Sequence, residues 1–146
     1  MGNFVPLWTQ TNLQTMNISY IIRIESRTAP IAGVEQSYVP MPFQKGSAAY
    51  GQKETRSSQG SLYKCTLSFK IAGITSESEA AVNRFRKARN IRITDINGWG
   101  VVLGGSSIRL VITREKNIEG TPGSFRGYKI KVEWNTPRPP AAESFI

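Results

Sequence analysis

The stretch LYKCTLSFKI, residues 62–71, alternates apolar and polar side chains with a period of two residues. Successive side chains of a β-strand point to opposite faces, so this period predicts a strand with one buried and one solvated face. The predicted core face carries Tyr63, Cys65, Leu67, Phe69 and Ile71. Cys65 is the single cysteine of the chain, and its place on this face predicts a buried free thiol.

Similar alternation extends outward from this strand in both directions. Residues 18–25 predict a strand with Ile18, Tyr20, Ile22 and Ile24 on one face, and residues 107–113 predict another. Residues 117–123 carry a Pro-Gly turn signal and predict a loop. The last predicted strand, residues 125–134, buries the apolar side chains of Tyr128, Ile130, Val132 and Trp134.

A hairpin is predicted where residues 91–96 and 99–103 flank the pair Asn97-Gly98, because both of these residues accept positive φ. A two-residue loop pairs Ile93 with Val102. It also sets Arg92 opposite Leu103, so the two faces are not cleanly sorted, and a bulge or burial on both faces would resolve that conflict.

One helix is predicted over residues 77–89. Ser76 is a suitable N-cap, and Glu79 three residues later completes a capping box. Phe85 lies on the apolar stripe that packs the helix on a sheet.

Residues 26–60 lack a clear period but contain prolines, glycines and several large apolar side chains. Loops longer than about 12–15 residues are uncommon in compact domains and are usually functional or disordered. We interpret the segment as an extended arm or long hairpin that orders against a neighbouring subunit; the alternative is a poorly ordered loop. The apolar side chains expected at this interface are Val34, Tyr38, Val39, Met41, Phe43 and Tyr50.

These elements predict a mainly β fold, a β-sandwich or barrel, with one α-helix inserted between strands, a long early loop and extended termini. The 146 residues suit one domain over residues 17–135. Residues 1–16 form an N-terminal arm in this prediction, and residues 136–146 form a proline-rich tail that dangles or docks through Phe145 and Ile146.

The composition argues against an enzyme. The chain has no histidine, one cysteine and ten acidic residues, whereas most hydrolytic, redox and metal chemistry uses these side chains. No catalytic residue, metal ligand or cofactor is predicted. No segment reaches the roughly 18 apolar residues of a membrane span, so no membrane partner is expected.

The net charge of +9 indicates either ordinary solubility or a polyanionic partner. The densest basic cluster is the candidate polyanion site, formed by Arg84, Arg86, Lys87, Arg89 and Arg92. Cations also stabilise a helix C-terminus, which is the structural alternative for most of this cluster. A second basic surface forms if the strands that carry Lys64 and Lys70, and Lys129 and Lys131, pair with each other. Alternating lysines on a solvent face are also an ordinary way to keep a sheet soluble, which is the structural alternative here.

The order of elements (strand 18–25, arm 26–60, strand 62–71, helix 77–89, then further strands) resembles the small structural proteins of phage tails, of the tail-tube or tail-terminator type. The resemblance implies a virion protein, assembled in the host cytoplasm, whose copies form rings that are commonly hexameric. It also implies neighbouring virion proteins as partners and transient contact with phage DNA. The basic charge departs from this pattern, because lumens through which DNA passes are often acidic in this group. The alternative function is a stand-alone basic module that binds nucleic acid.

Overall fold

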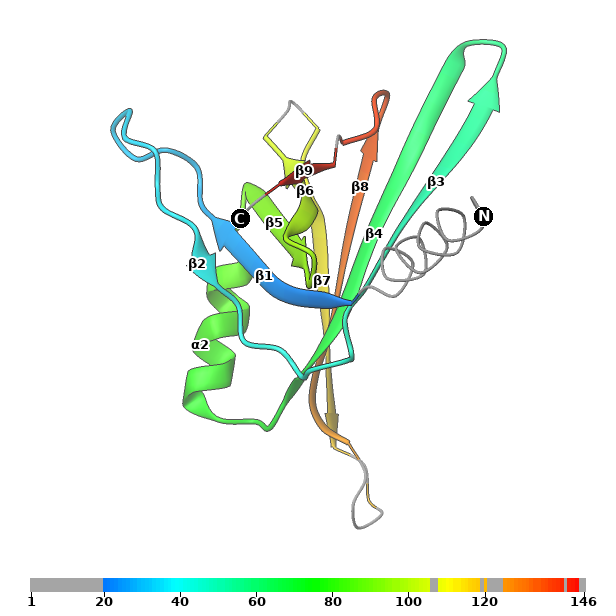
Figure 1. The fold of residues 1–146 in the computed structure, drawn as a ribbon. Helices are drawn as coiled ribbons and strands as arrows, with labels where there is room; N and C mark the ends of the chain where they lie inside the picture. Colours follow the sequence, from blue (N-terminus) through cyan, green and yellow to red (C-terminus); the bar gives the residue numbers. More distant parts are fainter. Residues whose placement is uncertain (1–19, 106–107, 119, 121–124, 141, 145–146) are drawn as a thin grey trace, which may run out of the picture.

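The computed structural model describes residues 20–105, 108–118, 120, 125–140 and 142–144. Within them the chain forms two antiparallel sheets and one short helix, which confirms the predicted mainly β fold (Figure 1). The first sheet has the strand order β2-β1-β5-β6-β9, and the second has the order β3-β4-β8-β7. The bounds are β1 Ile21–Arg27, β2 Val39–Pro40, β3 Ala49–Ser57, β4 Gly60–Ala72, α2 Ser76–Phe85, β5 Asn90–Asp95, β6 Trp99–Gly104, β7 Val111–Ile118, β8 Arg126–Thr136 and β9 Glu143–Ser144.

Both sheets and α2 contribute to one hydrophobic core. The core face of β4 is as predicted: Cys65, Leu67, Phe69 and Ile71 are buried, and Tyr63 is partly buried. β4 pairs along β8, whose Tyr128, Ile130, Val132 and Trp134 are buried as expected. Cys65 is a free cysteine with no exposed surface, which confirms the buried thiol.

Helix α2 begins one residue earlier than predicted and is shorter. Thr75, not Ser76, is the N-cap, and its side chain accepts a hydrogen bond from the Ser78 N–H at 3.1 Å. The Ser78 hydroxyl completes the capping box by accepting from the Thr75 N–H at 2.8 Å, so Glu79 has no part in it. The helix ends at Phe85, because the N–H groups of Lys87 and Ala88 turn back to carbonyls three residues earlier.

Glu79 instead joins α2 to the second sheet. Its Oε1 accepts hydrogen bonds from Lys116 Nζ and from the Tyr128 hydroxyl, both at 2.9 Å. The hydrogen bond from Lys116 lowers the pKa of Glu79 from its ordinary value, and the hydrogen bond from Tyr128 lowers it further. Burial and the carboxylate raise the pKa of Tyr128, so its hydroxyl remains a donor at neutral pH.

Replacing Glu79 with glutamine is expected to flatten the acid limb of the stability curve. Because the pKa of Glu79 is lower in the folded chain, its contribution is present above the unfolded pKa of about 4.3. It is lost as the pH falls through the folded pKa. Urea unfolding at several pH values between 7 and 3 measures this, with Glu115→Gln on β7 as the control. An acid limb equally steep in Glu79→Gln and in the unsubstituted chain would contradict the assignment.

The β5–β6 hairpin forms, but the predicted register is wrong by one residue. Ile93 lies opposite Val101, so the loop contains three residues, 96–98. Gly98 adopts a left-handed φ of 82°, and its N–H donates to the Asp95 carbonyl oxygen at 3.1 Å. The Asp95 carboxylate also accepts from the N–H groups of Asn97 and Trp99, at 2.9 and 3.0 Å. These contacts stabilise the longer loop over the two-residue turn that Asn-Gly alone indicates.

Strand β1 departs from the predicted alternation. Ile24 is buried, but Tyr20 and Ile22 are 43% and 41% exposed, and Ile18 lies outside the described residues. The pairing of β1 with β5 shifts between Ile21 and Arg23, so Ile22 is an extra residue on β1. Such a bulge changes the face on which the following side chains lie.

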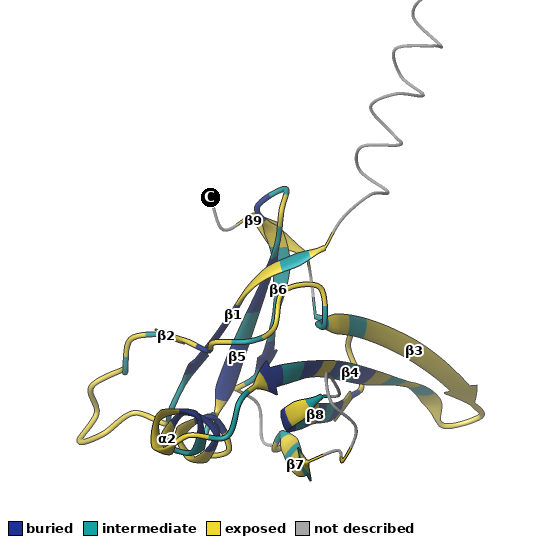
Figure 2. Cartoon of the chain, turned by 90° about the horizontal axis from the view of Figure 1, so that it is seen from below, coloured by how far each residue is buried: buried dark blue, intermediate teal, exposed yellow. Residues whose placement is uncertain are grey.

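The segment 26–60 contains a strand that the sequence did not reveal. β3 pairs with β4 along its whole length, from Ala49 opposite Ser68 to Ser57 opposite Gly60. The two strands form a long hairpin that extends beyond the rest of the molecule (Figure 1), and β3 is exposed over most of its length (Figure 2). The second half of the segment therefore supplies one strand of a hairpin whose other strand is the one predicted over residues 62–71. Its ordering against a neighbouring subunit stays a prediction.

The chain after β6 also differs in detail from the prediction. β7 begins at Val111 and continues to Ile118, so Asn117 belongs to a strand and not to a loop. Near the C-terminus, β9 pairs with β6 through Trp99 opposite Ser144. The predicted contacts of Phe145 and Ile146 and the N-terminal arm 1–16 lie outside the described residues.

Candidate functional site: open sheet edges and a basic cleft

Half of the predicted interface residues belong to the core of their own chain. Met41 is 3% exposed, and its N–H donates to the Ile24 carbonyl oxygen at 2.7 Å. Phe43 and Tyr50 are partly buried against the core, and the ring of Phe43 lies edge-on to Phe69 with centroids 6.1 Å apart. These side chains are therefore committed within the chain.

Tyr38 has partners within its own chain as well. The guanidinium groups of Arg27 and Arg92 lie 4.7 and 4.2 Å from the centroid of its ring. Among the six predicted interface residues, Val34 and Val39 remain as exposed apolar side chains. These two side chains, with the exposed Ile31 of the same segment, are the apolar surface that the predicted arm still offers to a neighbour.

The second sheet presents a different kind of contact surface, its two outer strands. β3 pairs with β4 and β7 pairs with β8, and no strand among the described residues pairs with the far side of either. β3 has nine residues and β7 has eight, and neither contains proline. An edge strand of this length leaves a row of backbone donors and acceptors unpaired. Natural proteins usually shorten, interrupt, charge or cover such edges, and β3 and β7 already carry one lysine each, Lys53 and Lys116.

The outer face of this sheet is basic. Lys70 lies directly opposite Lys129. The strands that carry these lysines therefore pair, as the predicted second basic surface requires. Lys131 and Lys64 lie 2.9 and 4.0 Å from carboxylate oxygens of Glu133, so part of the charge is neutralised. The hydrogen bond from Lys131 lowers the pKa of Glu133.

Two of the five predicted polyanion-binding residues have partners within the chain. Arg92 donates two hydrogen bonds to the Glu25 carboxylate, both at 3.1 Å, and it stacks on Tyr38. The Arg84 guanidinium donates to the Pro40 carbonyl oxygen at 3.3 Å. Arg92 is therefore a structural residue of the first sheet, and Arg84 ties the last turn of α2 to β2.

The other three, Arg86, Lys87 and Arg89, lie after the end of α2 and line a cleft of about 590 Å³ together with Arg109. All four are exposed, and none takes part in an ion pair with another described residue. Arg109 was missed in the sequence because it lies some 20 positions further along the chain. A single arginine that follows a pair of glycines does not indicate a basic binding site in the sequence.

A glycine turn brings the two parts of this cleft together. Gly104 has a φ of 87°, and a Cβ atom there would lie 2.1 Å from the Arg89 carbonyl oxygen. Gly105 has a φ of 84°, and a Cβ atom there would lie 2.6 Å from Asn90 Nδ2. Only glycine permits both this backbone conformation and this approach.

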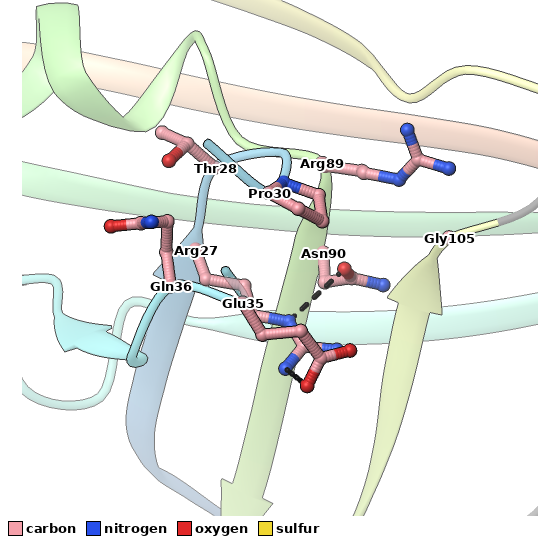
Figure 3. Close-up of a pocket in the computed structure, with 8 residues that line it drawn as sticks. All are labelled: Arg27, Thr28, Pro30, Glu35, Gln36, Arg89, Asn90 and Gly105. Carbon is pink, nitrogen blue, oxygen red and sulfur yellow. Dashed lines mark hydrogen bonds and ion pairs between the residues drawn. The ribbon is translucent and has the colours of Figure 1, made fainter. Parts of the chain in front are cut away.

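A second, smaller pocket of about 350 Å³ adjoins the cleft and shares Arg89 and Gly105 with it (Figure 3). Here Arg27 pairs with Glu35 at 3.8 Å and donates from Nε to Asn90 Oδ1 at 3.2 Å. The Arg89 side chain extends away from this pair, as Figure 3 shows. The charge of Arg27 is thus balanced by Glu35, whereas no carboxylate in the described part of the chain pairs with Arg89.

The described residues contain no group of three or more Asp, Glu, Cys or His side chains placed to hold a metal ion. Within the same part of the chain, no helix has the length and apolar character required to cross a membrane. Comparisons with protein-family models, curated proteins and solved structures found no match for this chain.

Proposed function

We propose that this chain is a non-enzymatic structural protein that assembles with copies of itself, and that it is a virion protein of the phage tail or head–tail junction. The single observation that supports assembly most strongly is the pair of long open edges on the second sheet. The finer assignment to a tube or terminator type rests on the resemblance in element order. The virion location and the neighbouring virion partners rest on the same resemblance.

The direction of the strands suits repetition. All neighbours in the order β3-β4-β8-β7 are antiparallel, so with four strands the two outer strands run in opposite directions. β7 of one copy can therefore pair with β3 of the next in the same antiparallel manner, which gives a continuous sheet. Head-to-tail contacts of this kind close into a ring or continue as a filament.

The lengths of the two edges also agree. Nine residues of β3 and eight of β7 offer edges of about 27–30 Å at the usual rise of about 3.4 Å per residue. Two large apolar side chains mark the ends of β7: Val111 is 57% exposed and Ile118 is 69% exposed. Because seven positions separate them, they lie on opposite faces of the sheet, and the side chains of an added strand would cover each of them in part.

Placing lysines on β7 is expected to prevent assembly. The variant Val111→Lys/Ile118→Lys replaces both apolar ends of β7 by charges on an edge that already carries Arg114 and Lys116. Further like charge on an edge strand disfavours strand pairing. Size-exclusion chromatography with light scattering should give a ring or polymer for the unsubstituted chain. The variant should elute as a 16.2 kDa monomer.

The matched control is Ile31→Lys/Val34→Lys, which adds the same charge at two side chains that are each 64% exposed on the loop between β1 and β2. It should assemble normally. A monomeric unsubstituted chain would overturn the proposal of self-assembly. Assembly that is lost in the control and retained in the β7 variant would move the interface from the sheet edges to the early loop.

A further inference from the structure

We propose that the cleft lined by Arg86, Lys87, Arg89 and Arg109 binds the phosphate backbone of a nucleic acid. This proposal stands on charge and geometry of a surface separate from the sheet edges, so it does not require that the chain assembles.

The cleft gathers positive charge that no described carboxylate neutralises. Among the described residues that line it, four are cations and none is Asp or Glu. Five described carboxylates, those of Glu25, Glu35, Glu54, Glu79 and Glu133, form ion pairs, and all of these pairs are with cations elsewhere. Four like charges held together without a counter-charge repel one another, and an anionic ligand would relieve that repulsion.

The end of helix α2 explains only part of this charge. The C-terminus of a helix carries about half an elementary negative charge, which one nearby cation balances. Arg84 already occupies the last turn of α2. Arg109 comes from the segment between β6 and β7, and the approach of Gly104 to the Arg89 carbonyl oxygen holds that segment close to residues 86–89.

The chemistry of the lining selects the kind of anion. Three of the four cations are arginines, whose planar guanidinium groups match a phosphate with two parallel hydrogen bonds. No aromatic side chain is among the described lining residues, so the cleft offers no platform on which a base could stack. Its remaining side chains, such as Ile108, Leu110 and Ala88, are aliphatic. We therefore expect this lining to contact the phosphate backbone of the nucleic acid, with little preference for its base sequence.

The test compares two variants of equal charge. The cleft variant carries Arg86→Ala, Lys87→Ala, Arg89→Ala and Arg109→Ala. The control carries Arg23→Ala, Lys45→Ala, Arg126→Ala and Arg138→Ala, four exposed cations outside the cleft, outside the two sheet edges and outside the ion pairs of the described residues. Each variant lowers the net charge from +9 to +5.

Binding to a 20-base-pair duplex and to a single strand of the same length is measured by fluorescence anisotropy at 50–200 mM salt. Four phosphate contacts on duplex DNA contribute a slope of about −3.6 in log affinity against log salt, which is roughly a 150-fold loss over this range. The cleft variant should lose most of this slope, and the control should retain it. On the single strand the corresponding contribution is about −2.8.

Two results would overturn the proposal. Equal loss of slope in the cleft variant and the control would show general charge attraction rather than a site. Absence of DNA binding by the unsubstituted chain at 50 mM salt would exclude nucleic acid as the ligand. Circular dichroism of both variants confirms that each is folded before binding is compared.

Discussion

Replacing Phe85 with alanine is expected to destabilise the fold by about 3–5 kcal/mol, the usual cost of removing a buried phenyl ring. Phe85 has no exposed surface and joins α2 to the core. Its ring lies edge-on to Phe69, with centroids 5.4 Å apart and an angle of 89° between the planes. Phe69 in turn contacts Phe43, so the substitution removes the end of a row of three aromatic rings joined by two contacts.

Urea unfolding followed by circular dichroism measures this free energy. Domains of this size are stable by only about 5–15 kcal/mol, so Phe85→Ala removes a large share of the free energy of unfolding. Phe85→Leu provides a second, milder substitution at the same position. The leucine variant keeps an apolar side chain in the site and should lose substantially less. Equal and small losses in both variants would mean that Phe85 does not anchor the helix as the structure indicates.

The elements predicted correctly are those whose two faces differ most. In β4 and β8 the side chains that alternate with the lysines, such as Leu67 and Val132, are fully buried, so a period of two residues is visible in the sequence. β3 carries no such signal, because its side chains are mostly polar and, apart from the partly buried Tyr50, its residues are exposed on both faces. β3 is held as a strand by backbone hydrogen bonds to β4, and its own side-chain pattern does not indicate this pairing.

Errors at the ends of elements have local causes that a pattern of side-chain types does not distinguish. Thr75 and Ser76 are both acceptable N-caps, and only the partner three residues later, Ser78 for Thr75, separates them. In the β5–β6 hairpin, the Asp95 carboxylate decides between loops of two and three residues.

The candidate site shows why closeness in sequence is a poor guide to a binding surface. Arg92 was grouped with Arg89 because three positions separate them, but Arg92 lies in the first sheet and pairs with Glu25. Arg109 is distant in sequence, and the turn at Gly104 returns it to the same cleft. The glycine pair before Arg109 indicates a turn in the sequence, but tertiary contacts decide which part of the molecule the chain reaches after that turn.

Replacing Arg92 with methionine is expected to destabilise the fold by about 3 kcal/mol without reducing the salt dependence of DNA binding. The Glu25 residue is 8% exposed, and among the described residues its carboxylate accepts hydrogen bonds only from Arg92. Removing one partner of a buried ion pair costs about 3–5 kcal/mol, since the other charge remains desolvated. We expect the lower end of this range because the Arg92 side chain is 30% exposed.

A double variant separates the pair from the packing around it. In Arg92→Met/Glu25→Leu neither charge remains, and replacing a buried pair by apolar residues is often close to neutral, so stability should largely return. The binding measurement then decides between the two roles of Arg92. As a structural residue, Arg92→Met should leave the slope of log affinity against log salt unchanged, whereas Arg89→Ala should reduce it by about 0.9 on duplex DNA. An Arg92→Met variant with unchanged stability and a reduced slope would return Arg92 to the polyanion site that its position in the sequence indicated. That result would mean that the Glu25 pair contributes little to the fold.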